Sequence, residues 1–180
     1  QKNTLSYEAL EFCIHCQKKR VKKMNIPYGI SESCCGEYDA KSNYQYKAHG
    51  VKSLCMRPDP FSATVISPYS TFLTLPSDVH DGMNNLKKLK DLGAYGRYGF
   101  FEAVDFSHNQ SPCMVRCFMS HHIGMSFLAA VNCLSDNIMQ KRFMRDEEMQ
   151  GCYSLFEEKI PSDAKTKKKP CKGETLQHSP

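Results

Sequence analysis

The sequence predicts a mainly α-helical fold whose helices are joined by long loops rich in polar and aromatic residues. Two stretches place apolar side chains at the three- and four-residue spacing of an amphipathic helix, and a third, around residue 125, is apolar almost throughout. Residues 27–66 lack this spacing and carry glycine, proline, tyrosine and serine instead. The 180 residues suit one domain or part of a larger one.

The first element is expected to be a helix over residues 4–24. Thr4 is a suitable N-cap, with Glu8 in the first turn. Pro27 disfavours helical backbone at Ile26, so the helix should stop near there. Its apolar stripe consists of Leu5, Leu10, Cys13, Ile14, Val21 and Met24.

Residues 27–66 predict a long loop region that leaves room for short strands, and loops of this length in a compact domain are often functional. Two helices should follow, over residues 68–76 and 78–92. Asp78 is the expected cap of the second helix, and Gly93 marks its C-terminal stop.

The stretch GAYGRYGFFEAVDF then predicts an aromatic turn followed by a short extended piece. Residues 113–134 predict the most apolar helix of the chain, which its composition makes a buried one. Two further helices are expected over residues 137–144 and 146–158. Residues 1–160 would then form the folded domain, with residues 161–180 as a Lys-rich linker or tail.

Charge and composition narrow the classes of function. Of the formal net charge of +5, the Lys-rich tail carries +3, so the body lacks the basic face that nucleic-acid binders usually have. No apolar run approaches the roughly 20 residues of a membrane helix, and the first residues do not form a signal peptide. The ten cysteines lack the spacing of a disulfide framework, which favours a reducing compartment.

Two glutamates lie in glycine- and aromatic-rich loops, Glu32 in IPYGISES and Glu102 in GRYGFFEAVD. Cleavage of a glycosidic bond needs a proton donor and a second carboxylate across the sugar. An aromatic, water-poor pocket can adjust one carboxyl group for the acid role. The pair is therefore a candidate catalytic site, although a single acid in such a loop is more often a helix cap or an ion-pair partner. The aromatic side chains nearby in the sequence are Tyr28, Tyr98, Phe100 and Phe101.

Adjacent histidines on the apolar helix, His121 and His122, point about 100° apart, so one could face a pocket while the other packs. Arg116 could hold a carboxylate or a sugar hydroxyl, or make a structural ion pair. Cys13 and Cys16, with His15 between them, leave a zinc or redox site as an alternative, but one Cys-x-x-Cys inside an amphipathic helix is a weak signal.

Three stretches together resemble, in order, a known family. They are IPYGISES followed by NYQYKAHGV, then VISPYSTFLTLP through GAYGRYGFFEAVDF, and finally MVRCFMSHHIGMSFLAAVNCLSDNIMQKRF with LFEEKIP. They are similar to the glucoamylase-like domain of bacterial cyclic β-1,2-glucan synthases, over roughly residues 15–161, and more distantly to endo-β-1,2-glucanases. The resemblance implies a partial (α/α)6 toroid with long catalytic loops, corresponding to the C-terminal portion of a larger domain.

The resemblance also implies that the domain cuts or transfers β-1,2-glucan with retention, without a cofactor. Glu32 then resembles the acid/base and Glu102 the nucleophile. The positions that match glucan contacts are Tyr28, Arg97, Tyr98, His121 and His122. The expected partner is β-1,2-glucan or a related β-glucan rather than nucleic acid. The chain would belong to a larger multidomain protein that is cytoplasmic, or that has this domain on the cytoplasmic side of an inner membrane.

Some positions depart from the family pattern. Tyr28 stands where the family commonly has tryptophan, Cys34 and Cys35 follow GISES, and MRPDP occupies residues 56–60. These changes leave open an alternative in which the chain is a non-catalytic carbohydrate-binding remnant of the domain.

Overall fold

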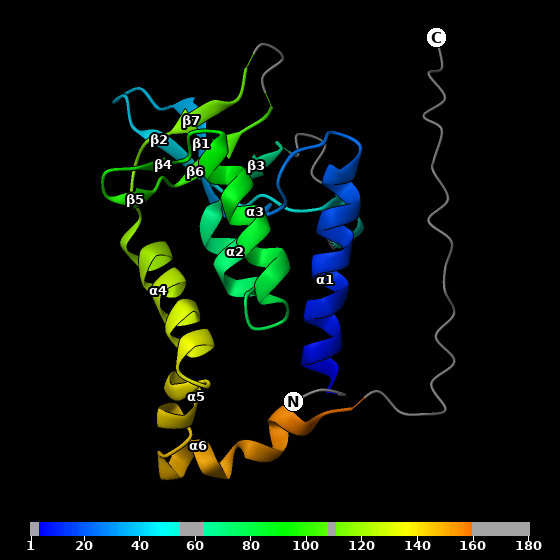
Figure 1. The fold of residues 1–180 in the computed structure, drawn as a ribbon. Helices are drawn as coiled ribbons and strands as arrows, with labels where there is room; N and C mark the ends of the chain where they lie inside the picture. The colour runs from blue at the N-terminus through cyan, green and yellow to red at the C-terminus, as the bar shows by residue number, and fades with distance from the viewer. Residues whose placement is uncertain (1–3, 55–62, 108–110, 160–180) are drawn as a thin grey trace.

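The computed structural model describes residues 4–54, 63–107 and 111–159, and the predicted linker 161–180 lies outside them. About half of the described residues are helical, and the rest include several short strands. The strands gather at one end of the molecule, and the helices extend away from them (Figure 1). The prediction of a mainly helical chain is thus confirmed only in part, because the sheet content is larger than expected.

Helix α1 (Leu5–Lys22) begins at Thr4, whose hydroxyl oxygen accepts a hydrogen bond from the Tyr7 backbone N–H at 3.4 Å. This cap satisfies a backbone donor that the helix itself cannot satisfy. The backbone N–H of Leu5 donates to the carbonyl of Glu158 at 2.7 Å. The first and last described segments therefore lie side by side, as Figure 1 shows.

The loop region predicted over residues 27–66 contains a β-hairpin made of β1 (Ser33–Tyr38) and β2 (Tyr44–Lys47). The strands are antiparallel, and Cys34 lies opposite Tyr46. The pairing is irregular between Cys34 and Tyr38, as in a β-bulge. A short 3-10 helix, η1, follows at Lys52–Leu54.

A three-stranded antiparallel sheet holds the centre of the strand-rich end. Its order is β3 (Val65–Ile66), β6 (Ala103–Asp105) and β7 (Cys113–Val115). All three residues of β6 are buried, and a buried strand needs backbone partners on both edges. Strands β3 and β7 provide them, which fixes the position of the residue before β6, Glu102.

Two helices and a small hairpin lie between β3 and β6 in the chain. Helix α2 spans Pro68–Thr74 with proline in its first turn, and α3 spans Val79–Asp91. The Asp78 carboxylate caps α3 by accepting the Asp81 N–H at 2.9 Å, as the sequence predicts. The hairpin consists of β4 (Tyr95–Gly96) and β5 (Gly99–Phe100).

The C-terminal part is a run of helices. Helix α4 (Ser120–Leu134) packs against α2 and leads into α5 (Ile138–Phe143). Helix α6 (Glu147–Gly151) and the 3-10 helix η2 (Tyr153–Glu157) then return the chain towards the start of α1 (Figure 1). None of the described helices is long and apolar enough to cross a membrane.

The predicted helix over residues 113–134 is wrong at its N-terminal end. Residues Cys113–Val115 form β7, and the helix begins only at Ser120. A short apolar run suits a buried strand as well as a helix, and here pairing with β6 decides the outcome. Arg116 consequently lies outside the helix, with its guanidinium 5.8 Å from the ring centre of Phe101.

The prediction that this helix is buried is also wrong for most of α4. Only His122 and Ala129 of this helix are buried. Several of its large apolar side chains are exposed: Ile123, Phe127, Leu128 and Leu134. Among the described residues, one side of α4 therefore has no covering element.

Two apolar clusters stabilise the described fold. The larger one lies between α1, α3 and the strands and is formed by Val21, Tyr28, Ile30, Val51, Ile66, Leu86, Leu89, Ala94 and Val104. The smaller one lies beneath β1, and its buried members are Cys34, Cys35, Val65, Ala103 and Val115.

Candidate active site

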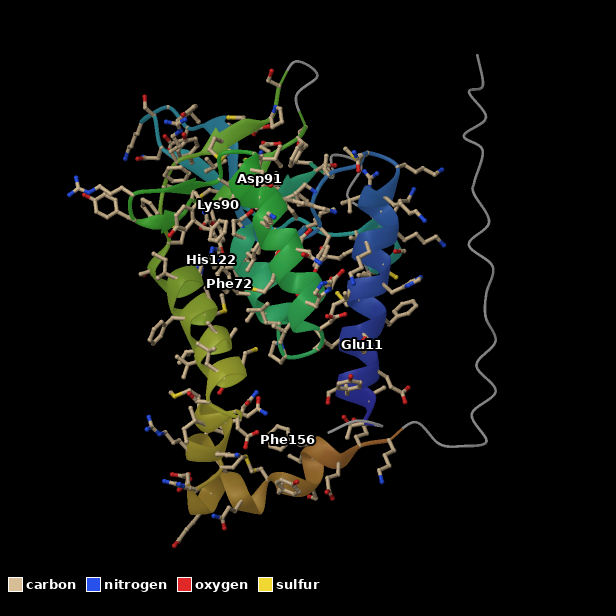
Figure 2. All side chains as sticks on the ribbon, in the orientation of Figure 1. Glu11, Phe72, Lys90, Asp91, His122 and Phe156 are labelled. Carbon is tan, nitrogen blue, oxygen red and sulfur yellow. The ribbon has the colours of Figure 1, made fainter. Side chains whose placement is uncertain are left out.

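An aromatic hollow of about 330 Å³ opens beside Glu102, between α2, α4 and the β4–β5 hairpin. Figure 2 shows the side chains of His122 and Phe72, both part of its wall, between α4 and α2. Such a hollow suits a ligand with flat apolar faces and a few polar groups. Its aromatic lining residues are Tyr69, Phe72, Tyr95, Tyr98, Phe100, Phe101, Phe118 and Phe127.

Glu102 is the buried acid of this hollow, with 4% of its surface exposed. Its backbone N–H donates to the Cys117 carbonyl at 3.0 Å, and its own carbonyl accepts the Ser67 hydroxyl at 2.6 Å. The Cys34 backbone N–H donates to Oε1 at 3.2 Å. Burial of a carboxylate is costly unless it is hydrogen-bonded, and these contacts offset that cost.

His122 lies in the first turn of α4 and is the second partner of the Glu102 carboxylate. Its Nδ1 atom is 2.9 Å from Oε1 and 3.0 Å from Oε2. The imidazole also stacks on the ring of Tyr69, with centroids 3.8 Å apart and an interplanar angle of 9°. The ring plane and the hydrogen bond together hold the carboxylate in one orientation.

Tyr46 of β2 contacts both adjacent histidines through its hydroxyl group. Its hydroxyl oxygen is 3.3 Å from Nε2 of His121 and 3.3 Å from Nε2 of His122. Burial, followed by the charges of Glu32 and other acidic neighbours including Glu102, raises the pKa of Tyr46 to about 12. The phenol therefore keeps its proton at neutral pH.

The Glu32 side chain is exposed, and its backbone is hydrogen-bonded to Tyr69, the residue whose ring stacks on His122. The Tyr69 hydroxyl donates to the Glu32 carbonyl at 3.1 Å and lies 2.6 Å from the Ser31 hydroxyl. Burial raises the pKa of Tyr69, and the charges of both Glu102 and Glu32 add to that shift. Both glutamates thus lie within electrostatic reach of Tyr69, but of the two only Glu102 is among the residues that line the hollow.

The predicted sugar contacts Arg97 and Tyr98 form the tip of the β4–β5 hairpin. Tyr98 lines the hollow and remains 75% exposed. The Arg97 guanidinium lies 5.3 Å from the Tyr98 ring centre, a cation–π arrangement. Of the histidine pair, His122 lines the hollow, whereas His121 is exposed and contacts His122, with ring centroids 4.0 Å apart, and the Tyr46 hydroxyl.

Tyr28 is not among the residues that line the hollow beside Glu102. It is buried in the larger core cluster, and its hydroxyl donates to the Asp81 carboxylate at 2.7 Å. Its N–H donates to Asn85 Oδ1 at 3.1 Å. It lines a separate, Lys-rich hollow of about 470 Å³ between α1 and α3.

The zinc alternative is not supported by the described part of the chain. There, no group of three or more histidine, cysteine, aspartate or glutamate side chains is arranged to hold a metal ion. Cys13 and Cys16 are free thiols on α1.

Sequence reasoning missed two residues of the site, Tyr46 and Tyr69. Both lie inside stretches that carry the family resemblance, NYQYKAHGV and VISPYSTFLTLP. Their location in these stretches is a signal that could have identified them as site residues, whereas the local spacing of apolar residues gives no such signal.

Comparison with known proteins places this chain in a family. The Glycoamylase family model, described as "Putative glucoamylase", matches residues 1–147. The cyclic beta-(1,2)-glucan synthase NdvB of Rhizobium meliloti (strain 1021) is 32% identical over 147 residues, which are 79% of this chain and 5% of that protein.

Solved structures share the fold. The endo-beta-1,2-glucanase from Chitinophaga pinensis, in complex with sophorotriose and glucose, has a TM-score of 0.53 at 21% identity, over 82% of this chain and 32% of that chain. The "putative glucoamylase" from Bacteroides uniformis ATCC 8492 has a TM-score of 0.58 at 18% identity, over 82% of this chain and 33% of that chain.

The chain thus spans about a twentieth of the synthase's length and about a third of the solved chains. The resemblance noted in the sequence is confirmed, since the family model covers most of the chain. The chain belongs to the Glycoamylase family.

Proposed function

We propose that the chain is part of a glycoside-processing domain that cleaves or transfers β-1,2-glucan. The observation that carries the proposal is the buried Glu102 carboxylate, fixed by His122 and the Cys34 N–H at the wall of an aromatic hollow. The names of two relatives, a cyclic beta-(1,2)-glucan synthase and an endo-beta-1,2-glucanase, support the choice of glucan.

The proposed mechanism uses two carboxylates and retains the anomeric configuration. Glu102 attacks the anomeric carbon, while Glu32 protonates the departing glycosidic oxygen. Glu32 then deprotonates a water molecule or a sugar hydroxyl, which displaces Glu102 from the covalent intermediate. Water as the acceptor gives hydrolysis, and a sugar hydroxyl gives transfer.

The way each acid is held supports this division of roles. Glu102 is fixed on both oxygens, which suits a nucleophile that must meet one carbon atom. Glu32 is exposed, which suits a group that exchanges protons with solvent and sugar. Sugar faces would stack on Tyr98 and the other rings of the hollow, and Arg97 and His121 would contact hydroxyl groups at its edge.

We further propose that the chain forms one part of an (α/α)6 toroid within a larger multidomain protein. The uncovered side of α4 supports this, because helices of a toroid pack on both neighbours. The free cysteines among the described residues are typical of a reducing compartment, which supports a position on the cytoplasmic side.

A second candidate is glucan binding without turnover. The exposed apolar side of α4 favours it, because a hollow left open on one side offers stacking surfaces to a glucan without enclosing the bond to be cleaved.

The test is incubation of this chain, and of a longer protein containing it, with linear β-1,2-glucan, followed by chromatography of the products. Glu102→Gln should abolish products, while the matched control Glu37→Gln, an exposed residue of β1, should retain them. Cleavage that survives Glu102→Gln would exclude the mechanism. Glucan binding without products in the longer protein would favour the second candidate.

A further inference from the structure

The Tyr46 hydroxyl stands between two adjacent histidines on α4. Its oxygen is equally far, 3.3 Å, from Nε2 of His121 and Nε2 of His122. The two imidazole centroids are 4.0 Å apart. A phenol carries one hydrogen, so it can donate to only one of these nitrogens and must accept from the other.

The carboxylate at the far side of His122 decides which nitrogen receives that hydrogen. Nδ1 faces both oxygens of Glu102, and a carboxylate accepts but does not donate. Nδ1 must therefore carry a proton. In a neutral imidazole, Nε2 is then an acceptor, so Tyr46 donates to it.

Ring stacking holds the plane of the His122 imidazole. The Tyr69 ring covers one face of it, with centroids 3.8 Å apart and the planes nearly parallel, so tilting of the imidazole out of this plane would break the contact. With the ring plane held, the in-plane hydrogen bonds alone select the tautomer.

We propose that Tyr46 is a positioning residue that donates to Nε2 of His122 and so reinforces the tautomer that Glu102 selects, with the proton on Nδ1. His121 then donates to the Tyr46 oxygen and carries its own proton on Nε2. The two adjacent histidines thus hold opposite tautomers, in an ordered chain from the exposed His121 to the buried Glu102.

The ordering matters for catalysis in a way that rests on the proposed function. If His122 adopted the other tautomer, a bare Nδ1 would face the carboxylate, and Glu102 would lose one of its donors. The nucleophile would then lose its fixed orientation, and small misplacements of reacting groups are costly.

The test is nitrogen–proton correlation NMR of the full chain with 15N-labelled histidine, at a pH where both imidazoles are neutral. The signals are assigned with His121→Gln and His122→Gln. We expect His122 to be protonated at Nδ1 and His121 at Nε2. Tyr46→Phe should shift the Nε2 resonance of His122 towards that of a nitrogen without a hydrogen-bond donor, whereas the matched control Tyr44→Phe, on the same strand but stacked on Tyr38, should not.

The same tautomer in both histidines, an imidazolium at His122, or an unchanged His122 signal in Tyr46→Phe would overturn the proposal. If Tyr46→Phe does not fold, the wild-type tautomers alone decide. In an active longer protein, Tyr46→Phe should lower kcat about 10- to 100-fold with little change in KM. A wild-type protein that cleaves no glucan would count against the proposed function and leave the NMR result unaffected.

Discussion

The phenol ring of Tyr69 lies face to face with the imidazole of His122, while its hydroxyl holds the backbone of Glu32. One side chain of α2 therefore connects the loop that carries one candidate acid to the histidine that orients the other. The two glutamates are far apart in the sequence, and Tyr69 is a physical link between their supports.

Removal of the Tyr69 hydroxyl should therefore separate positioning from packing. Tyr69→Phe keeps the stacked ring but loses the contacts with Glu32 and Ser31. The free energy of unfolding should fall by about 1 kcal/mol, as for one buried hydrogen bond. Glucan turnover by an active longer protein should fall by more than this loss of stability accounts for. Urea denaturation and product chromatography measure the two effects, and unchanged turnover would contradict the link.

The Glu102–His122 pair should be coupled energetically. His122→Ala leaves a buried carboxylate short of a donor, and the free energy of unfolding should fall by about 3 kcal/mol. Glu102→Gln should cost less, because an amide tolerates burial better than an unpaired charge. The stability loss of the double variant should be smaller than the sum of the two single-variant losses by at least about 1 kcal/mol. Simple additivity in chemical denaturation would mean that the pair does not interact.

Tyr28 offers a test of a sequence-based expectation against its position in the core. Tyr28→Phe removes the hydrogen bond to Asp81 but keeps the buried ring, so stability should fall by about 1 kcal/mol. Glucan affinity, measured by calorimetry at a temperature where the variant is folded, should not change, because the residue lines a different hollow. Weaker glucan binding would restore its predicted role.

Local sequence patterns predict those helices and strands that are stabilised by interactions among residues close together in the sequence. Helix α3 is an example, because a cap at Asp78 and a regular apolar face suffice to define it. Strand β7 was missed because its stability comes from pairing with β6, and composition does not encode that partner. The residues of the candidate site fall into the same two groups: those that the sequence itself marks, and those whose role depends on contacts made by the fold.

Glu32 and Glu102 stand out in the sequence by residue type and by family resemblance. Tyr46 and Tyr69 do not, since their role arises only when β2, α2 and α4 meet. Tyr28 shows the converse, because an aromatic residue in a glycine-rich loop looks exposed until the fold buries it.

The loop that carries Glu32 depends on one glycine. Gly29 has φ of +133°, and a Cβ there would lie 2.8 Å from the Ser70 hydroxyl oxygen and 3.0 Å from the Ser67 carbonyl. Gly29→Ala should therefore lower stability by about 2 kcal/mol. The matched control Gly124→Ala, in α4 with open space around it, should raise stability by about 0.5 kcal/mol. Thermal unfolding compares the two, and equal effects would contradict the argument.

The thiol of Cys117, whose carbonyl accepts the Glu102 N–H, should react slowly. Burial, together with Cys34 and the charge of Glu102, raises the pKa of Cys117 from 9.0 to about 12. A raised pKa means that less thiolate is present at pH 8 in the folded protein than in the unfolded chain, and only the thiolate is alkylated readily. Iodoacetamide labelling followed by mass spectrometry should show slow modification of Cys117 that accelerates above pH 9. Rapid labelling at pH 8 without unfolding would contradict this.

The hydrogen bond from Leu5 to Glu158 has a consequence for chain connectivity. Because it brings the two ends of the described chain together, a short peptide could join them with little distortion. New termini could then open in the exposed turn between β1 and β2, around residues 39–43, far along the sequence from the joined ends. The described residues are therefore suited to circular permutation, in which the order of the elements along the chain changes while their arrangement in space does not.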